Sequence, residues 1–267
     1  MPLLHLLLVA VIQGVTEFLP ISSSGHLVLL PELTGLDDQG LTIDVAVHVG
    51  TLAAVILYFW GDVRRVLHGT GRLLRGKVDT QSAFLALCLA VATVPVVIAG
   101  LIISIMEWDA AMRSTAVIGW TMFGFGILLY VADMQRDQTR DAEHWTLKHA
   151  LILGLWQVLA LIPGTSRAGI CITGARFLGY ARVDAARLSM LMAIPTIAAS
   201  GVLLGADVIG DANVALARDA TIAAAFAFLA ALLALAIMMR LATRISFTPY
   251  VVYRVVLGAV LLWIAYT

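Results

Sequence analysis

The chain has 267 residues, of which 61% are hydrophobic and 13% are charged, and its mean hydropathy is +0.97. The charged share is about half that of soluble globular domains, which argues against a soluble enzyme and excludes a disordered or disulfide-stapled chain. Basic and acidic residues balance at 17 each, so no net field indicates a nucleic-acid partner. We therefore expect an all-α polytopic membrane protein that forms a single domain over residues 1–267.

The first apolar region, residues 3–35, is broken by the polar string PISSSGH at residues 20–26. The arms of such a region hold about 12–18 residues, fewer than the roughly 20 that a helix needs to cross a bilayer. A polar break at membrane depth is stable only where protein or a water-filled cavity surrounds it. The region therefore predicts a re-entrant hairpin, whose two arms enter from the same face of the membrane.

Three apolar segments of about 20 residues follow, and each is long enough to span a bilayer. Residues 148–180 then form a second interrupted region, broken by PGTSRAG at residues 163–169, which predicts a second re-entrant hairpin. Three more segments of spanning length complete the chain. The six predicted spans are residues 41–60, 83–105, 114–132, 184–206, 219–239 and 247–266.

The charges beside the spans predict the orientation. If the six spans cross the membrane in alternating directions, twelve Lys and Arg residues fall on one face of the membrane. Only Arg113 and Arg218 then lie in the loops on the opposite face. By the positive-inside rule the twelve lie in the cytoplasm, so both termini lie outside. The first hairpin then enters from the outside and the second from the cytoplasm. The twelve cations are Arg64, Arg65, Arg72, Arg75, Lys77, Arg136, Arg140, Lys148, Arg182, Arg187, Arg240 and Arg244.

The two breaks resemble each other. Residues 20–23 read PISS and residues 163–166 read PGTS, an offset of 143, whereas Gln13 and Gln157 match at an offset of 144, so one gap reconciles them. Each break precedes three spans, and three spans invert the chain. The pattern predicts inverted repeats of about residues 1–135 and 145–267, an architecture that many transporters share.

The breaks have the composition of an anion site. A Pro followed by Ser and Thr before an apolar helix indicates a helix N-terminus, where free N–H groups carry partial positive charge. Two such N-termini that meet from opposite sides suit a phosphate group. Arg167 lies inside the second break, and its guanidinium can bind phosphate oxygens in pairs. The alternative is an Arg that snorkels or that pairs with a structural acid.

The first break carries reactive side chains. Glu17 lies one turn before Pro20, and a run of three serines and then His26 follow. A carboxylate, a hydroxyl and an imidazole are the parts of nucleophilic catalysis, and Glu17 can also bind Mg²⁺ or Ca²⁺. Three alternatives stay open: serines that only cap a helix, a His26 that is only a polar wall, and a Glu17 that is the structural partner of Arg167.

Three further polar residues fall within predicted spans. Asp44 and His48 are four residues apart and share a helix face, so they either pair with each other or line the cavity. Arg254, in the last span, is expected to reach a phosphate or to neutralise an acid.

At these residues the chain resembles a known family. The strings QGVTEFLPISSSGH at residues 13–26 and PGTSRAGICITGA at residues 163–175 resemble the signature regions of bacterial undecaprenyl-diphosphate phosphatases of the bacitracin-resistance type. The resemblance covers nearly the whole chain and includes an FDxxxHxGT-like stretch at residues 43–51 and RISFTPYVVYR at residues 244–254.

The resemblance implies a membrane phosphatase that removes the terminal phosphate of a C55 isoprenyl diphosphate. This reaction recycles the lipid carrier of cell-wall building blocks and confers resistance to bacitracin. It implies dependence on a divalent cation, Mg²⁺ or Ca²⁺, and a site that faces the periplasmic side of the bacterial inner membrane. It also implies a fold of six spans and two inverted re-entrant hairpins, in agreement with the spacing and charge of this sequence.

The resemblance also implies residue roles. Glu17 serves metal or proton handling, Ser23 is the nucleophile, His26 is its acid/base partner and Arg167 binds phosphate. Two positions depart from the family pattern: Gln13 replaces a residue that is often Glu and adds no charge, and Ala168 replaces a Ser. The substrate-binding residues are expected to be Gln13, Ser22, Ser24, Gly164, Thr165, Ser166, Thr173 and Arg254.

The hypothesis is therefore in-line attack by Ser23 on the terminal phosphorus, with His26 taking the proton and water hydrolysing the phosphoserine. Attack by water or by His26 is an alternative. The rival function is a transporter or flippase for a polyprenyl phosphate, because inverted repeats and broken helices also suit a carrier. The expected partners are the polyprenyl diphosphate and membrane lipids, with no nucleic acid. A homodimer is compatible with the sequence, although no motif demands one.

Overall fold

The computed structural model describes residues 2–35, 39–108, 112–135, 139–208 and 214–267. Within these ranges the chain is helical and forms no β-strand beyond an isolated bridge between Arg140 and Tyr180. Six of the described helices are long and apolar enough to span a membrane, which confirms the six predicted spans. They are α3 (Gly40–Tyr58), α5 (Gln81–Ile105), α7 (Thr115–Asp133), α10 (Arg182–Val208), α11 (Val214–Ala242) and α12 (Thr248–Tyr266).

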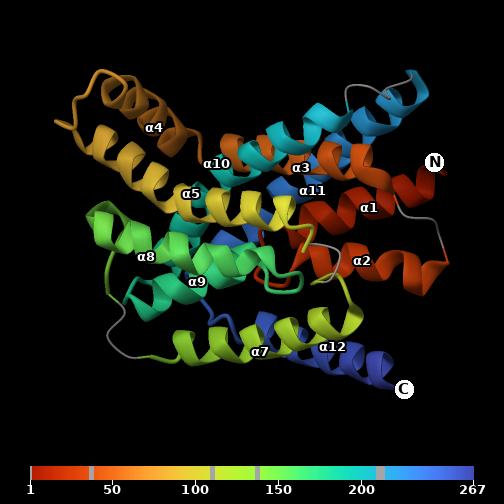
Figure 1. The fold of residues 1–267 in the computed structure, drawn as a ribbon. Coiled ribbons are helices and arrows are strands. Elements are labelled where there is room, and N and C mark those ends of the chain that lie inside the picture. Colours follow the sequence, from red (N-terminus) through yellow and green to blue (C-terminus); the bar gives the residue numbers. More distant parts are fainter. Residues whose placement is uncertain (1, 36–38, 109–111, 136–138, 209–213) are drawn as a thin grey trace.

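Both interrupted regions form helix–break–helix units. The first consists of α1 (Leu3–Thr16) and α2 (Ser23–Thr34), and the second of α8 (Leu147–Val158), the short η2 (Leu159–Leu161) and α9 (Arg167–Phe177). In Figure 1 the open end of the α1–α2 unit lies at the right, on the side of both termini, whereas the α8–α9 unit opens at the left. The two breaks meet in the middle of the bundle. Their re-entry into a bilayer stays a prediction.

Apart from α4 (Trp60–Leu73), the described helices of the two halves make corresponding contacts. α1 packs against α11, as α8 packs against α5. In the same way α3 contacts α11 and α10 contacts α5, and α7 of the first half pairs with α12 of the second. The predicted gap between the breaks is wrong. Ser22 and Ser166 hold the same N-cap position, Gly25 and Gly169 donate to them, and Gln13 and Gln157 lie in the preceding helices, all at an offset of 144. The string match aligned Ser23 with Ser166, whereas the backbone aligns Ser23 with Arg167.

Glycines let these helices approach closely. A Cβ on Gly14 of α1 would lie 2.6 Å from the Ala227 carbonyl oxygen of α11, and one on Gly154 of α8 would lie 2.6 Å from that of Ala92 in α5. Small residues at helix crossings are typical of membrane bundles, because close backbone contact replaces the hydrophobic effect as the force that holds the helices together.

A helix that the sequence analysis did not predict, α4 (Trp60–Leu73), occupies most of the charged segment between the predicted spans 41–60 and 83–105. The helix buries Val63 and Gly69 and leaves its other face exposed, a periodicity that the many charges obscured. Gly69 lies so close to the Ser82 backbone of α5 that a Cβ there would overlap the Ser82 carbonyl. In Figure 1, α4 lies at the upper left, at the end of the bundle away from the termini.

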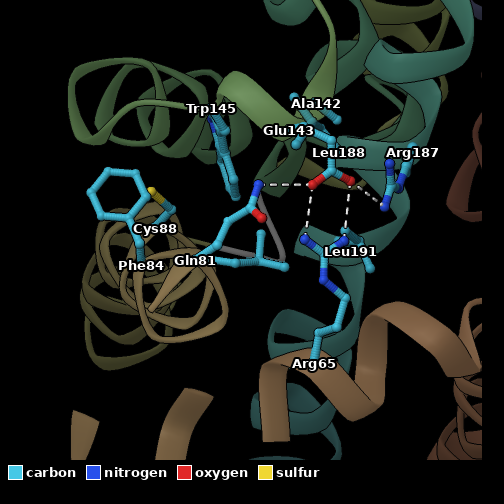
Figure 2. Close-up of a pocket in the computed structure, with 11 residues that line it drawn as sticks. Arg65, Gln81, Phe84, Cys88, Ala142, Glu143, Trp145, Arg187, Leu188 and Leu191 are labelled. Atoms are coloured by element: carbon cyan, nitrogen blue, oxygen red, sulfur yellow. Dashed lines mark hydrogen bonds and ion pairs between the residues drawn. The ribbon is translucent and has the colours of Figure 1, made fainter. Parts of the chain in front are cut away.

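An ion-pair cluster connects α4 to the second half (Figure 2). Arg65 donates two hydrogen bonds to Glu143 of the short helix η1 (Ala142–His144), at 3.1 and 2.8 Å, and Gln81 of α5 donates a third at 3.0 Å. Arg187 of α10 pairs with Glu143 at 3.0 Å and donates from Nε to Asp62 of α4 at 2.9 Å. The hydrogen-bonded Arg65 guanidinium lowers the pKa of the Glu143 carboxyl to about 2.

Close packing of α3 on α11 gives a test of the fold. A Cβ on Gly50 would lie 2.2 Å from the Ala224 carbonyl oxygen, whereas nothing lies within 4 Å of a Cβ on Gly124. We expect Gly50→Ala to destabilise the protein by about 1–3 kcal/mol because backbone must move apart. Gly124→Ala, by contrast, should be neutral or stabilise it by about 0.5–1 kcal/mol. Thermal unfolding of both variants in one detergent measures this; equal melting temperatures would contradict the packing.

Candidate functional site

A cavity of about 440 Å³ lies between the two breaks. Side chains from both breaks, from α3 and from α10 line it, and so do Leu41 in the first turn of α3 and Arg113 just before α7. Both helices begin at the end of the molecule that carries the termini (Figure 1). The polar residues that line it are Gln13, Glu17, Ser22, Ser23, Ser24, Gln39, Asp44, His48, Arg113, Gln157, Ser166, Arg167, Thr196 and Ser200.

Each helix after a break begins at a strained serine. Ser22 has φ 75° and ψ 99°, Ser166 has φ 68° and ψ 110°, and each side-chain oxygen accepts a hydrogen bond from the glycine N–H three residues later. A non-glycine residue at positive φ costs on the order of 1–3 kcal/mol and persists where the surroundings fix it. Both helix N-termini, with their partial positive charge, therefore border the cavity.

Arg254 lies outside the cavity lining and joins the two breaks through their backbone carbonyls. It is fully buried, and its Nη2 donates to the carbonyls of Thr165 at 2.8 Å and Gly164 at 3.2 Å. Its Nη1 lies 3.5 Å from the Pro20 carbonyl of the other break. Gly169 leaves room for it, because a Cβ there would lie 2.7 Å from Nη1. Arg254 was predicted to reach a phosphate or an acid, but the structure places it off the cavity, with backbone carbonyls as its partners.

Glu17 is the centre of the polar network in the cavity. Its Oε2 accepts hydrogen bonds from Ser23 Oγ at 2.7 Å and from Gln13 Nε2 at 2.9 Å, and its Oε1 accepts one from Arg167 Nη2 at 2.9 Å. His48 Nε2 lies 3.9 Å from Oε2. The predicted alternative of a Glu17–Arg167 ion pair is therefore present, and it lies on the cavity beside Ser23 rather than apart from the site.

Two buried atoms beside Glu17 have no hydrogen-bond partner in the part of the chain that the structure describes. Arg167 Nη1 is a donor and Gln13 Oε1 is an acceptor. An unpaired buried polar atom is costly, so such atoms suggest groups that a ligand satisfies. A phosphate oxygen suits the guanidinium N–H, and a hard cation suits the amide oxygen next to a carboxylate.

The donor set also bears on a divalent cation. The described residues contain no group of three or more His, Cys, Asp or Glu side chains that could hold a metal ion. Glu17 and the unpaired Gln13 Oε1 nevertheless supply adjacent oxygens, the donor type that Mg²⁺ and Ca²⁺ prefer. The residues thus fit a cation that takes most of its ligands from phosphate and water.

His26 is turned away from Ser23. Its Nδ1 lies 2.6 Å from the Ser22 carbonyl oxygen, which only accepts, so Nδ1 carries the hydrogen. Its Nε2 lies 2.6 Å from the Tyr253 hydroxyl, and the two rings stack with centroids 5.6 Å apart. Tyr253 was not among the predicted residues. Only the packing of α12 beside the break places it there, so no local sequence signal marks it.

The other predicted binding residues divide into two groups. Ser22, Ser24 and Ser166 line the cavity, and Ser24 Oγ also accepts a hydrogen bond from the Gly164 N–H at 3.4 Å, which joins the two breaks. Gly164, Thr165 and Thr173 lie off the cavity. The Thr173 hydroxyl donates to the Gly169 carbonyl within α9 at 2.7 Å.

Asp44 and His48 both line the cavity, which was one of the two predicted alternatives; the other was that they pair with each other. His48 Nδ1 lies 2.7 Å from the backbone carbonyl of Asp44, and Gln39 Nε2 donates to the Asp44 carboxylate at 2.8 Å. Gln39, Arg113, Thr196 and Ser200 are cavity residues that the sequence did not single out, since they lie at helix ends or on a span far along the chain.

Comparison with known proteins extends these observations. The family model described as "Bacitracin resistance protein BacA" matches residues 6–260. The chain is 67% identical to the undecaprenyl-diphosphatase of Roseobacter denitrificans and 66% identical to that of Dinoroseobacter shibae, over 100% of each chain. It is 48% identical to undecaprenyl-diphosphatase 1 of Rhodospirillum rubrum, over 100% of this chain and 96% of that one.

The role of Arg254 can be tested against a surface arginine. We expect Arg254→Met to lower the yield of folded protein and the melting temperature sharply. The variant leaves several buried carbonyls unsatisfied, at about 1–3 kcal/mol each. Arg218→Met, at an exposed position, should change stability by less than about 0.5 kcal/mol. If Arg254→Met melted with the wild type and lost only affinity for phosphate, a ligand-binding role would replace the structural one.

Proposed function

This chain belongs to the Bacitracin resistance protein BacA family, and we propose that it hydrolyses the terminal phosphate of undecaprenyl diphosphate to give undecaprenyl phosphate. Relatives of nearly identical length carry the name undecaprenyl-diphosphatase. The observation that carries the proposal is the buried and unpaired Arg167 Nη1, on a cavity that also holds Glu17 and Ser23. The product is the lipid carrier of cell-wall synthesis, so the activity would confer bacitracin resistance.

The cavity suits both parts of such a substrate. Arg167 and the N-termini of α2 and α9 offer donors and positive charge to the diphosphate. Apolar side chains occupy much of the remaining wall, where they would accompany the first isoprenyl units towards the lipid. These apolar residues are Leu27, Leu41, Val45, Val96, Ala160, Leu161 and Ile197.

Ser23 is the proposed nucleophile, and Glu17 rather than His26 is its immediate proton acceptor. The Ser23 hydroxyl already donates to Glu17 Oε2 at 2.7 Å. As Ser23 Oγ forms a bond to the terminal phosphorus, its proton passes to Glu17 and the bond from that phosphorus to the bridging oxygen breaks. The bridging oxygen leaves with the electron pair as part of the lipid monophosphate. Water then attacks the phosphoserine phosphorus, the bond from phosphorus to Ser23 Oγ breaks, and Glu17 returns the proton to Ser23 Oγ as inorganic phosphate departs.

His26 has a positioning role in this scheme. Its Nδ1–H holds the Ser22 carbonyl at the strained turn that aims Ser23 at Glu17, and Tyr253 fixes the ring from the other side. A divalent cation, held by Glu17 and the amide oxygen of Gln13, would neutralise phosphate charge. The remaining contributions come from the chain itself: Arg167 binds the phosphate and Glu17 receives the proton.

We place the protein in the bacterial cytoplasmic membrane with the cavity open to the periplasm. Among the described residues, the cations predicted to be cytoplasmic lie on α4 and in the loops and helix ends at the opposite end of the bundle from the termini (Figure 1). Arg136 lies outside the described residues. The cavity extends towards the end with few cations, where Arg113 lies.

Phosphate release from a long-chain isoprenyl diphosphate by purified protein in detergent tests the activity. We expect Ser23→Ala and Arg167→Ala each to lower kcat/KM by about 100-fold or more, since each removes an interaction made with the reacting phosphate. EDTA should stop the reaction and Mg²⁺ or Ca²⁺ restore it. Arg218→Ala, an exposed arginine off the cavity, is the matched control.

Near-normal turnover of Ser23→Ala would exclude it as the nucleophile and leave water or His26. The alternative function is transport of a polyprenyl phosphate. The corresponding contacts of the two halves support it, because many transporters are built from repeats. Folded protein that binds the lipid diphosphate and releases no phosphate would favour that rival, and lipid flipping in proteoliposomes would then be the next assay.

Two substitutions of His26 separate positioning from proton transfer. His26→Asn keeps an N–H donor within reach of the Ser22 carbonyl but cannot titrate, whereas His26→Leu keeps neither property. We expect the Asn variant to retain turnover within about tenfold of the wild type and the Leu variant to lose much more. Steady-state rates across pH, with folding checked by size exclusion, measure this. Equal inactivity of both folded variants would return His26 to the role of acid or base.

A further inference from the structure

The exposed face of α4 carries a regular apolar stripe. Trp60, Leu67 and the C-cap residue Leu74 follow one another at intervals of seven residues, which is about two helical turns. The three side chains therefore lie on the same side of α4. Their exposed fractions are 48%, 61% and 84%. We call these three residues the α4 stripe. No described element of the chain covers it.

Unpaired cations flank the α4 stripe. Arg64 lies one turn after Trp60, and Arg75 and Lys77 follow Leu74; all three are exposed and have no ion-pair partner among the described residues. The acids nearest in sequence are already engaged. Asp62 pairs with Arg187 and Asp79 pairs with Arg72. The surface around the stripe is therefore positively charged although the whole chain has no net charge.

The opposite face of α4 fixes the direction in which the stripe points. Arg65 pairs with Glu143, as Figure 2 shows, and Asp62 pairs with Arg187 of the same cluster. Gly69 contacts the backbone of α5 at Ser82 with no room for a side chain. These contacts hold α4 by one face, so the exposure of the other is a property of the folded protein rather than of a loose helix.

We propose that the α4 stripe and its cations contact the anionic phospholipid surface of the leaflet at this end of the molecule. The chain is a multi-pass membrane protein, and α4 follows directly on the span α3 and precedes the span α5, so it begins at the end of a spanning helix. A helix that presents Trp and Leu between basic residues binds the headgroup region by apolar burial and by attraction to anionic lipid. This inference does not depend on the proposed enzyme activity.

A fluorescent label on the stripe tests the contact. Leu67→Cys can be labelled selectively with an environment-sensitive dye because both native cysteines, Cys88 and Cys171, are buried. The labelled full-length protein is reconstituted in vesicles of phosphatidylcholine and phosphatidylglycerol, with brominated acyl chains on one lipid at a time. We expect brominated phosphatidylglycerol to quench the dye about twofold or more strongly than brominated phosphatidylcholine at equal mole fraction. Molar salt should remove the difference, since it shortens the Debye length to about 3 Å.

Two controls make the test decisive. The triple variant Arg64→Gln, Arg75→Gln, Lys77→Gln should lose the preference for the anionic lipid while the protein stays folded. A label at Ile105→Cys, exposed at the other end of α5, should show equal quenching by both lipids. Three results with the labelled Leu67→Cys protein that keeps its cations would each overturn the proposal. They are equal quenching by the two lipids, the emission of a water-exposed dye without quenching, and energy transfer between labelled copies, which would indicate a second copy as the partner.

Discussion

The rest of the structure depends on one constraint: two breaks in the helices lie inside an apolar bundle, where lipid cannot satisfy their backbone polar groups. Arg254 meets most of this demand by donating to the carbonyls of Thr165 and Gly164 and by approaching that of Pro20. The Thr121 hydroxyl lies 2.6 Å from the Pro163 carbonyl and donates to it. With the carbonyls held from behind, the N-termini of α2 and α9 are left to face the cavity, which is the arrangement that an anion requires.

The two halves share a backbone plan and divide the chemistry between them. At the offset of 144 set by the N-cap serines, Ser23 corresponds to Arg167, Glu17 to Leu161 and Ser24 to Ala168. The first break thus carries the Ser23 hydroxyl and the Glu17 carboxylate, and the second carries the Arg167 guanidinium. Ala168, the counterpart of Ser24, is also the position that departs from the family pattern which the resemblance implies. Ala168 is fully buried and lies off the cavity, so the hydroxyl it lacks would not have faced a ligand.

The sequence predicted the parts of the molecule that composition alone determines. Six spans follow from long apolar runs, and Glu17 and Arg167 follow from the rarity of charged residues beside breaks in apolar helices. The choice of Ser23 within the serine run came only from the family resemblance. The register of the repeat did not follow, because the matching letters PISS and PGTS hide a one-residue shift that only the positive φ of Ser22 and Ser166 exposes. Tyr253 and the role of Arg254 depend on where α12 packs, which no local pattern encodes. α4 was missed because its charges outweigh its periodicity.

Charge balance in the cavity explains why a cation belongs in the proposed mechanism. The ionisable residues that line it are Glu17, Asp44, His48, Arg113 and Arg167, whose charges cancel when His48 is neutral. A diphosphate would enter this neutral, largely apolar space with two or more negative charges, and Arg167 already shares its guanidinium with Glu17. A divalent cation held at the site would restore the balance. Gln13 is neutral, so it makes the cavity less attractive to a cation than a second acid would, but also less repulsive to the diphosphate. On the proposed mechanism, a cation at this site would therefore take most of its ligands from phosphate oxygens and water, with Glu17 and Gln13 supplying the protein's share.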